Sequence, residues 1–212
     1  MRIPLILKLK KQRHKEIARA QDILVQELYK VFDKAVLHGG TSIWRCYNGN
    51  RFSEDIDVYI PRDMKKINIL FKNLEKKGFR ILKRKISKNS LFSNLKKDNI
   101  VVRLEAIFKK QKGYLKEYET IDGNLITIYS LLPEIILKEK VNAYLKRLKI
   151  RDLYDVFFLL RHIKDNQDIK KDLKILIKDF KKPIDANELK VLIIEGIVPG
   201  YDKMLSYIKR EI

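Results

Sequence analysis

Two aspartates, Asp55 and Asp57, are the residues whose type and spacing point most clearly to chemistry. They open residues 55–60, where polar and apolar side chains alternate as in a strand. On a strand, residues two apart face the same side, with Cα atoms roughly 6.5–7 Å apart. Carboxylates on one face repel each other unless a cation lies between them, and Mg²⁺ or Mn²⁺ suits such ligands. The pair predicts a divalent metal site, although aspartates that merely solvate an edge strand would show the same spacing.

The residues just before this strand suit a phosphate group. Gly39 and Gly40 have no side chains to keep a phosphate from the backbone, and residues 41–47 read as the start of a helix with free N–H groups. Ser53 adds a hydroxyl donor two residues before the first aspartate. Together with a metal pair, these features predict a site for a metal-bound phosphate group. The predicted nucleotide-binding residues are Gly39, Gly40, Thr41, Arg51, Ser53 and, from a later helix, Lys140, with Arg45 as a further candidate.

A third carboxylate is expected from a neighbouring strand that faces the same site. Residues 100–108 read as a strand whose two faces differ in character. Glu105 lies on the more polar face, which makes it the third predicted metal ligand and the group that activates an acceptor hydroxyl. An ion pair with Arg103 or a nearby lysine is the alternative. One face carries Val101, Arg103 and Glu105, and the other, suited to the core, carries Val102, Leu104 and Ala106.

A later helix places one lysine apart from its neighbours. Helical spacing puts Lys140 at the edge of the apolar stripe, whereas Lys138, Lys146 and Lys149 point away from it. Lys140 is therefore expected at the boundary of the core, either as a phosphate ligand or as a lysine whose stem packs while its ammonium group reaches water. Asp152 either caps the start of the next helix or pairs with Lys140 and holds it extended. The stripe consists of Leu137, Val141, Tyr144 and Leu148.

Four segments of the chain share the motifs of one known family. They are Gly39-Gly40-Thr41, Asn50-Arg51-Phe52-Ser53-Glu54-Asp55-Ile56-Asp57, the helix EIILKEKVNA over residues 134–143, and Arg151-Asp152-Leu153-Tyr154-Asp155. Together they resemble the AbiEii-type nucleotidyltransferase toxins of the DNA polymerase β-like superfamily. The resemblance implies that the first two segments bind metal and triphosphate, that Lys140 contacts phosphates and that a downstream aspartate supports the site. It also implies a toxin partnered by an antitoxin, with tRNA as the favoured acceptor. A protein or small-molecule acceptor, or an ordinary metabolic role, is compatible with the same resemblance.

The pattern along the chain predicts a protein of the α/β (α+β) class. A polymerase β-like nucleotidyltransferase domain with a mixed sheet is expected over residues 1–130, and a C-terminal helical bundle over residues 131–212. Pro61 is expected as the first residue of a helix that ends near residue 77. The predicted strands are 33–37, 55–60, 79–86, 100–108, 118–121 and 125–128; the predicted helices are 11–29 and segments starting near 41, 61, 130, 151, 168, 185 and 200, with a polar loop over 87–99.

Composition narrows the choice of partner and compartment. The net charge is +20 and the pI about 9.8, which favours a polyanion such as RNA, although AT-rich coding or adaptation to heat also enriches lysine. The single cysteine, Cys46, excludes an internal disulfide and a thiolate zinc cluster. No apolar run approaches the roughly 20 residues of a membrane-spanning helix, and the basic residues follow the apolar N-terminus rather than precede it. A cytoplasmic protein without membrane partners is expected.

Two functions from different classes fit these features. The first is an enzyme that uses Mg²⁺ to transfer a nucleoside monophosphate from a nucleoside triphosphate (NTP) to an acceptor hydroxyl, which the charge and the resemblance place on RNA, at the 3′ end of tRNA. The second is a non-catalytic basic protein that binds RNA or a partner and retains the fold. The full set of carboxylates favours the enzyme, because buried acids without partners are costly to keep.

Overall fold

The computed structural model describes residues 3–212 and divides the chain into two compact units. The α/β unit consists of residues up to Asn48 together with Phe52–Leu131, and the helical unit consists of Gly49–Arg51 together with Leu132–Ile212. The main division therefore falls between residues 131 and 132. The short segment Gly49–Arg51 belongs to the helical unit, although in sequence it precedes the strand that carries Asp55 and Asp57.

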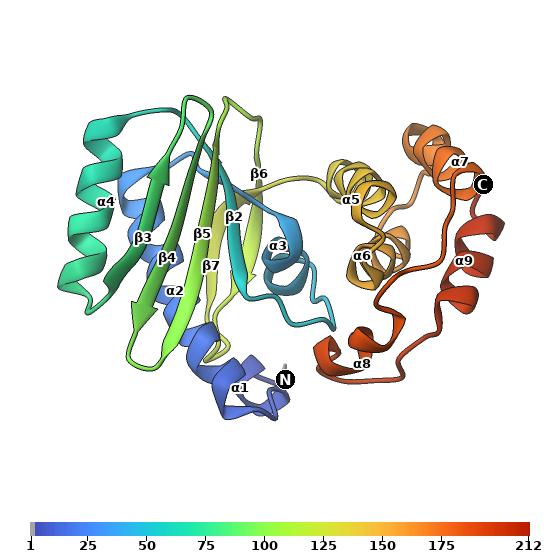
Figure 1. The fold of residues 1–212 in the computed structure, drawn as a ribbon, viewed down its shortest axis with the longest axis horizontal. Helices are drawn as coiled ribbons and strands as arrows, with labels where there is room; N and C mark the ends of the chain where they lie inside the picture. The colour runs from blue at the N-terminus through green and yellow to red at the C-terminus, as the bar shows by residue number, and fades with distance from the viewer. Residues whose placement is uncertain (1–2) are drawn as a thin grey trace. The chain divides into compact units, whose positions relative to one another are not determined.

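The α/β unit is built on one seven-stranded mixed sheet with the order β3-β4-β5-β2-β1-β7-β6 (Figure 1). Two neighbouring pairs, β1 with β7 and β2 with β5, run parallel, and the remaining pairs run antiparallel. This arrangement confirms the expected mixed sheet. The strands are β1 Val36–His38, β2 Asp55–Ile60, β3 Arg80–Ile86, β4 Ser90–Lys97, β5 Ile100–Phe108, β6 Tyr114–Glu119 and β7 Leu125–Ser130.

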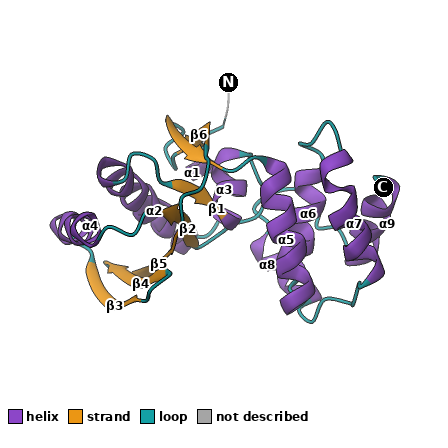
Figure 2. Cartoon of the chain, turned by 90° about the horizontal axis from the view of Figure 1, so that it is seen from above, coloured by secondary structure: helices purple, strands orange, loops and turns teal. Residues whose placement is uncertain are grey.

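Helices α2 (Gln12–Val31) and α4 (Met64–Lys76) cover one face of the β3–β4–β5–β2 part of the sheet (Figures 1 and 2). The short α1 (Leu5–Lys8) precedes them, and α3 (Gly39–Cys46) packs against β1, β2 and β6. Strand β5 shows why the sheet has one covered face. Val102, Leu104 and Ala106 are buried, whereas Val101 and Arg103 are exposed, as the alternation predicts.

The loop expected over residues 87–99 was wrong, because residues 90–97 form β4. The segment is polar in composition, but Leu91, Ser93 and Leu95 alternate on its buried face. Its outward residues are polar or aromatic, which hid the alternation. The N1 position expected for Pro61 was also wrong: α4 starts at Met64 because the Asp63 carboxylate caps it, accepting from Lys66 N at 3.0 Å.

The helical unit contains two long helices, α5 (Pro133–Arg147) and α6 (Ile150–Leu160), joined by a tight turn. Leu148 makes this turn in the left-handed conformation, with φ of 52°, and its N–H group donates to Tyr144 O. No helix within residues 3–212 is long and apolar enough to cross a membrane. The remaining segments are η1 Gln167–Ile169, α7 Lys170–Lys178, η2 Ala186–Glu188, α8 Leu189–Leu192 and α9 Tyr201–Arg210.

Candidate active site

The three predicted carboxylates lie on one face of two adjacent strands. In the parallel pairing of β2 with β5, Asp57 lies opposite Glu105 and Asp55 lies opposite Arg103. All four side chains therefore point to the side of the sheet that α2 and α4 leave uncovered. Arg103 Nη1 lies 3.4 Å from Asp55 Oδ2 and 3.6 Å from Glu105 Oε1, so the ion pair weighed as an alternative for Glu105 is present alongside the carboxylate arrangement.

Burial and mutual repulsion of the carboxylates on this face both shift the pKa of Glu105. Partial burial raises the pKa of Glu105, and the negative charges of Asp57 and Asp55 raise it further, while Arg103 acts in the opposite direction. Oxygen donors that repel one another are a donor set that a divalent cation would stabilise, and in this respect the residues fit Mg²⁺. Within residues 3–212, no three acidic, histidine or cysteine side chains converge closely enough to form a ready-made metal site. The carboxylates would have to turn from Arg103 toward a shared ion.

Gly39 is required by the position of Asp57. Its φ is 71°, in the left-handed region, and a Cβ built on it would overlap Asp57 Oδ2. Gly39 is also the first residue of α3, so the N-terminal N–H groups of this helix lie beside the Asp57 carboxylate. A helix N-terminus next to metal-binding carboxylates can hold the phosphates of a metal-bound nucleotide.

Thr41 and Ser53 have structural contacts next to the predicted phosphate site. The Thr41 hydroxyl is fully buried and donates to the backbone carbonyl of Asp55 at 2.5 Å, which ties α3 to the start of β2. The backbone carbonyl of Ser53 accepts from Gln21 Nε2 at 2.9 Å. Arg45, a further phosphate candidate in the sequence, is instead buried in the core, 3.1 Å from Asp22.

Replacing Gly39 with Ala is expected to impair transfer and to destabilise the α/β unit. The left-handed conformation alone costs an L-residue roughly 1–2 kcal/mol, and the new methyl group would push the Asp57 carboxylate away. The free energy of unfolding and the rate of nucleotidyl transfer would be measured together. Gly196→Ala is the control, because Gly196 also has a positive φ but a Cβ there meets no atom within 4 Å. Equal activity of the two variants would contradict the placement of Asp57 in the site.

In the helical unit, buried charges gather around Asp155. Arg51 donates to both carboxylate oxygens of Asp155, with Nε–Oδ1 at 2.9 Å and Nη2–Oδ2 at 2.8 Å, and Lys140 Nζ lies 2.8 Å from Asp155 Oδ2. Lys140 is 3.6 Å from Asp152, whose carboxylate instead accepts two bonds from Arg147, at 2.7 and 2.8 Å. We name these five residues the Asp155 network. Lys140 is 7% exposed, in keeping with its predicted place at the core boundary.

The ion pairs in the Asp155 network differ from those expected from the sequence. Asp152 was considered as the partner of Lys140, yet Asp155 is the closer partner and also holds Arg51. Burial raises the pKa of Asp155, but Arg51 and Lys140 outweigh this and leave that pKa below its usual value. Asp155 is therefore ionised and compensates two buried cations. Arg51, predicted as a nucleotide ligand, is engaged by a bidentate ion pair inside the helical unit.

The predicted residues thus form two groups, each within one unit. The metal and phosphate candidates of the α/β unit are Asp55, Asp57, Glu105, Gly39, Gly40, Thr41 and Ser53, and those of the helical unit are Arg51, Lys140 and Asp152. The family model of the nucleotidyltransferase AbiEii toxin, a type IV toxin–antitoxin system, matches residues 22–206, which include both groups. The chain belongs to this family. It is accordingly a nucleotidyltransferase, and the AbiEii resemblance seen in the sequence motifs is confirmed.

Solved structures share the fold of this AbiEii-family protein. MenT4, the nucleotidyltransferase toxin Rv2826c from Mycobacterium tuberculosis H37Rv, is similar with a TM-score of 0.66 and 18% identity, covering 94% of this chain and 82% of that one. JHP933 from Helicobacter pylori gives a TM-score of 0.64 and 20% identity over 95% of this chain and 90% of that one. No curated protein matches the sequence. At these identities the neighbours establish the fold alone.

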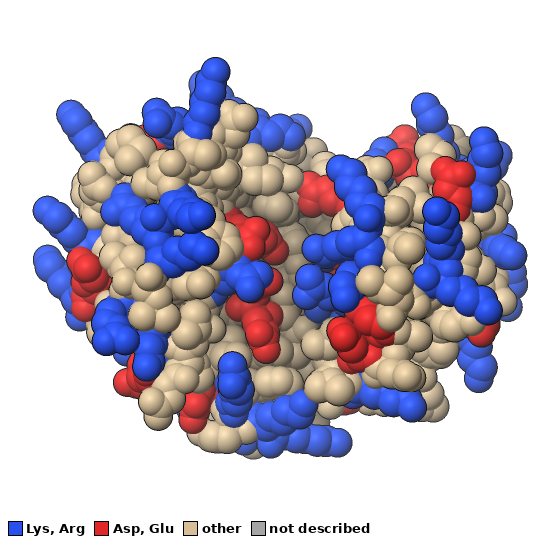
Figure 3. All heavy atoms as spheres, viewed as in Figure 1, with Lys and Arg blue, Asp and Glu red and all other residues tan. Residues whose placement is uncertain are grey.

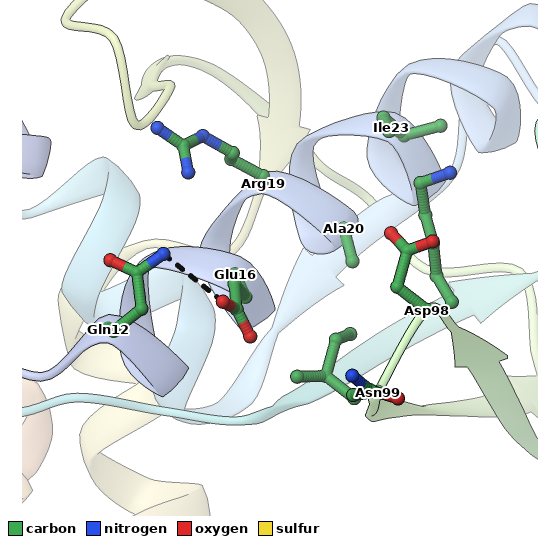
Figure 4. A pocket seen from close by; sticks show the side chains of 9 residues that line it. Gln12, Glu16, Arg19, Ala20, Ile23, Asp98 and Asn99 are labelled. Atoms are coloured by element: carbon green, nitrogen blue, oxygen red, sulfur yellow. Dashed lines mark hydrogen bonds between the residues drawn. The ribbon is translucent and has the colours of Figure 1, made fainter.

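A pocket of the AbiEii-family α/β unit lies apart from these residues. It has a volume of about 350 Å³ and is bounded by α2 and the turn between β4 and β5 (Figure 4). Within it, Gln12 donates to Glu16 across one turn of α2 at 3.1 Å. None of the carboxylate or glycine residues of the motif lines this pocket. Its mixed charges, with Arg19 and Asp98 both at its wall, give no preference for an anionic nucleotide.

Proposed function

We propose that this AbiEii-family enzyme uses Mg²⁺ to transfer a nucleoside monophosphate from an NTP to a hydroxyl group of RNA, at the 3′ end of tRNA, and that an antitoxin protein controls it. The observation that carries the proposal is the register of β2 and β5. It sets Asp57 opposite Glu105, with Asp55 on the same face, beside the N-terminus of α3. This combination of carboxylates and free N–H groups suits a metal-bound triphosphate.

The residues divide the chemistry among them. Asp55, Asp57 and Glu105 would hold the metal, and Mg²⁺ supplies positive charge where negative charge develops on the phosphates. The N–H groups at Gly39 and Gly40, with the Ser53 hydroxyl, hold the triphosphate in line for attack. The acceptor oxygen bonds to the α-phosphorus, its proton passes to Glu105, and the bond to the β-phosphate oxygen breaks, so pyrophosphate leaves. Thr41 maintains the position of Asp55 through its buried hydroxyl.

The helical-unit residues enter the proposal through the family motifs. A phosphate contact by Lys140 would require its ammonium group to exchange Asp155 for phosphate, because the two now lie 2.8 Å apart. Asp152 holds Arg147 and lies within 3.6 Å of Lys140, so it can retain the lysine during such an exchange. We assign Arg51 to positioning, through Asp155, rather than to direct phosphate binding.

The acceptor can be tested by following the label. Incubation with each α-labelled NTP and total RNA is expected to label RNA, and the activity should fall steeply with salt, because 47 basic against 27 acidic residues favour a large polyanion. Each single-stranded phosphate contact contributes a slope of about 0.7 in log activity against log salt. Label transfer from the γ-phosphate, or an acceptor that survives nuclease treatment, would overturn the proposal.

A further inference from the structure

The uncovered face of the sheet continues past the carboxylates onto β4 and β3. In the register of these strands, Glu105 lies opposite Phe92 and Phe92 lies opposite Lys85. One row along, Arg103 lies opposite Asn94 and Asn94 lies opposite Lys83. Residues in register on adjacent strands point to the same side of a sheet. We name the surface formed by Lys83, Lys85, Phe92, Asn94 and Arg103 the β3–β5 face.

The positive charge of this face is not compensated on β3. Lys83 and Lys85 are both exposed, and within residues 3–212 neither has a carboxylate at ion-pair distance. The ring of half-buried Phe92 lies between cations: Lys83 Nζ is 5.4 Å and Arg103 Cζ 5.8 Å from its centroid. Figure 3 shows basic side chains gathered over β3 and β4 beside a band of acidic side chains.

On the opposite side of β3, Arg84 packs against α4, so its charge is not part of the β3–β5 face. Arg84, between the two lysines, points toward α4, where its guanidinium stacks 4.2 Å from the Phe71 centroid and donates to Asn68. That arginine has packing partners within the fold. Lys83 lies over the Phe92 ring, and the exposed Lys85 lies opposite Phe92 in the β3–β4 register, so both charges are directed to solvent and to whatever binds there.

An aromatic ring that lies near cations on an open strand face can bind single-stranded nucleic acid. Bases stack on the ring, and ammonium and guanidinium groups contact the backbone phosphates. Adjacent strands are roughly 4.8 Å apart, so Phe92 lies about 5 Å and Lys85 about 10 Å along the sheet from Glu105. A strand whose terminal hydroxyl reached the carboxylates would therefore place its preceding nucleotides over this surface.

We propose that the β3–β5 face binds the single-stranded end of the acceptor RNA, with a base stacked on Phe92 and phosphates at Lys83 and Lys85. The direction of the strand toward Glu105 rests on the proposed nucleotidyl transfer, whereas the binding itself does not. An acidic protein segment would use the lysines but would gain little from the aromatic ring. The ring between the cations is what favours nucleic acid over such a partner.

The test is fluorescence anisotropy with a labelled, unstructured RNA oligonucleotide over a series of salt concentrations, without NTP. Phe92→Leu, which retains an apolar side chain, is expected to weaken binding about tenfold, and Phe92→Trp to restore it. Lys83→Gln with Lys85→Gln should reduce the salt slope by about 1.4, that is, two contacts at about 0.7 each. The matched control is Lys170→Gln with Lys174→Gln on α7, two exposed lysines with the same change in charge.

The outcomes separate this inference from the proposed function. An equal loss of RNA affinity in both double variants would show that only bulk charge matters. An unchanged RNA affinity of Phe92→Leu would show that no base stacks on this ring. Either result overturns the inference. Competition by polyglutamate as effective as by RNA would assign the surface to an acidic protein and also overturn it. If wild-type protein binds RNA through this face but transfers no label to it, the inference stands and the proposed function fails.

Discussion

Asp57→Asn is expected to lower nucleotidyl transfer at least ~100-fold while leaving the fold intact, because loss of one preorganised electrostatic group has effects of this size. Asp57 lies opposite Glu105 in the β2–β5 register and beside the first residue of α3, so its carboxylate is next to both the proposed metal position and the proposed phosphate position. The amide keeps the shape of the side chain but not its charge. Single-turnover transfer from an α-labelled NTP measures the effect.

Binding provides a second measurement on the same variant. Mg²⁺ with NTP should raise the melting temperature of the wild-type protein by ligand linkage, and this rise should shrink in Asp57→Asn. Glu54→Gln is the control, since Glu54 is exposed and lies in the same segment. A folded Asp57→Asn protein with wild-type turnover would remove Asp57 from the metal site.

Asp155→Asn is expected to cost about 3–5 kcal/mol in the free energy of unfolding of the helical unit, because it leaves two buried cations without a full counter-charge. Arg51 and Lys140 both lie within 2.9 Å of Asp155, which is 1% exposed. The loss is a large part of the roughly 5–15 kcal/mol that usually stabilises a domain. Urea denaturation followed by circular dichroism measures it.

The pH dependence gives this prediction a sign. The folded pKa of Asp155 is below its usual value, so its ion pairs stabilise the protein fully above the unfolded pKa of about 3.9 and lose that effect as pH falls through the folded pKa. Asp155→Asn should flatten this acid limb. Asp179→Asn, at an exposed position of the same unit, should change stability by less than about 0.5 kcal/mol. Similar losses in the two variants would contradict the network.

The common face of the candidate carboxylates could be predicted from sequence because it depends only on local strand geometry. Strand alternation alone placed Asp55 and Asp57 on one side and separated Glu105 from Leu104. Helical phase likewise distinguished Lys140, now buried, from Lys138 and its other neighbours. In each case one element of regular period determines which way a side chain faces, so no knowledge of distant contacts was needed.

The remaining features depend on partners far away in the chain. Arg51 and Asp155 are 104 residues apart, and nothing in either segment indicates that their charges meet. Gln21, in a helix, holds the carbonyl of Ser53 on the approach to β2. Strand β4 escaped prediction because its outward face, including Phe92 and Asn94, mixes aromatic and polar residues and so hides the buried alternation.

The position of Arg51 in the chain limits where the gene can be cut into two folding fragments. The helical unit includes Gly49–Arg51, so the chain passes from one unit to the other three times, and neither unit is one continuous segment. A fragment ending at Leu131 would carry Arg51 without Asp155, and the complementary fragment would carry Asp155 and Lys140 without Arg51. Recombination at this boundary would therefore separate a buried ion pair, so the two units should be inherited together rather than exchanged as independent modules.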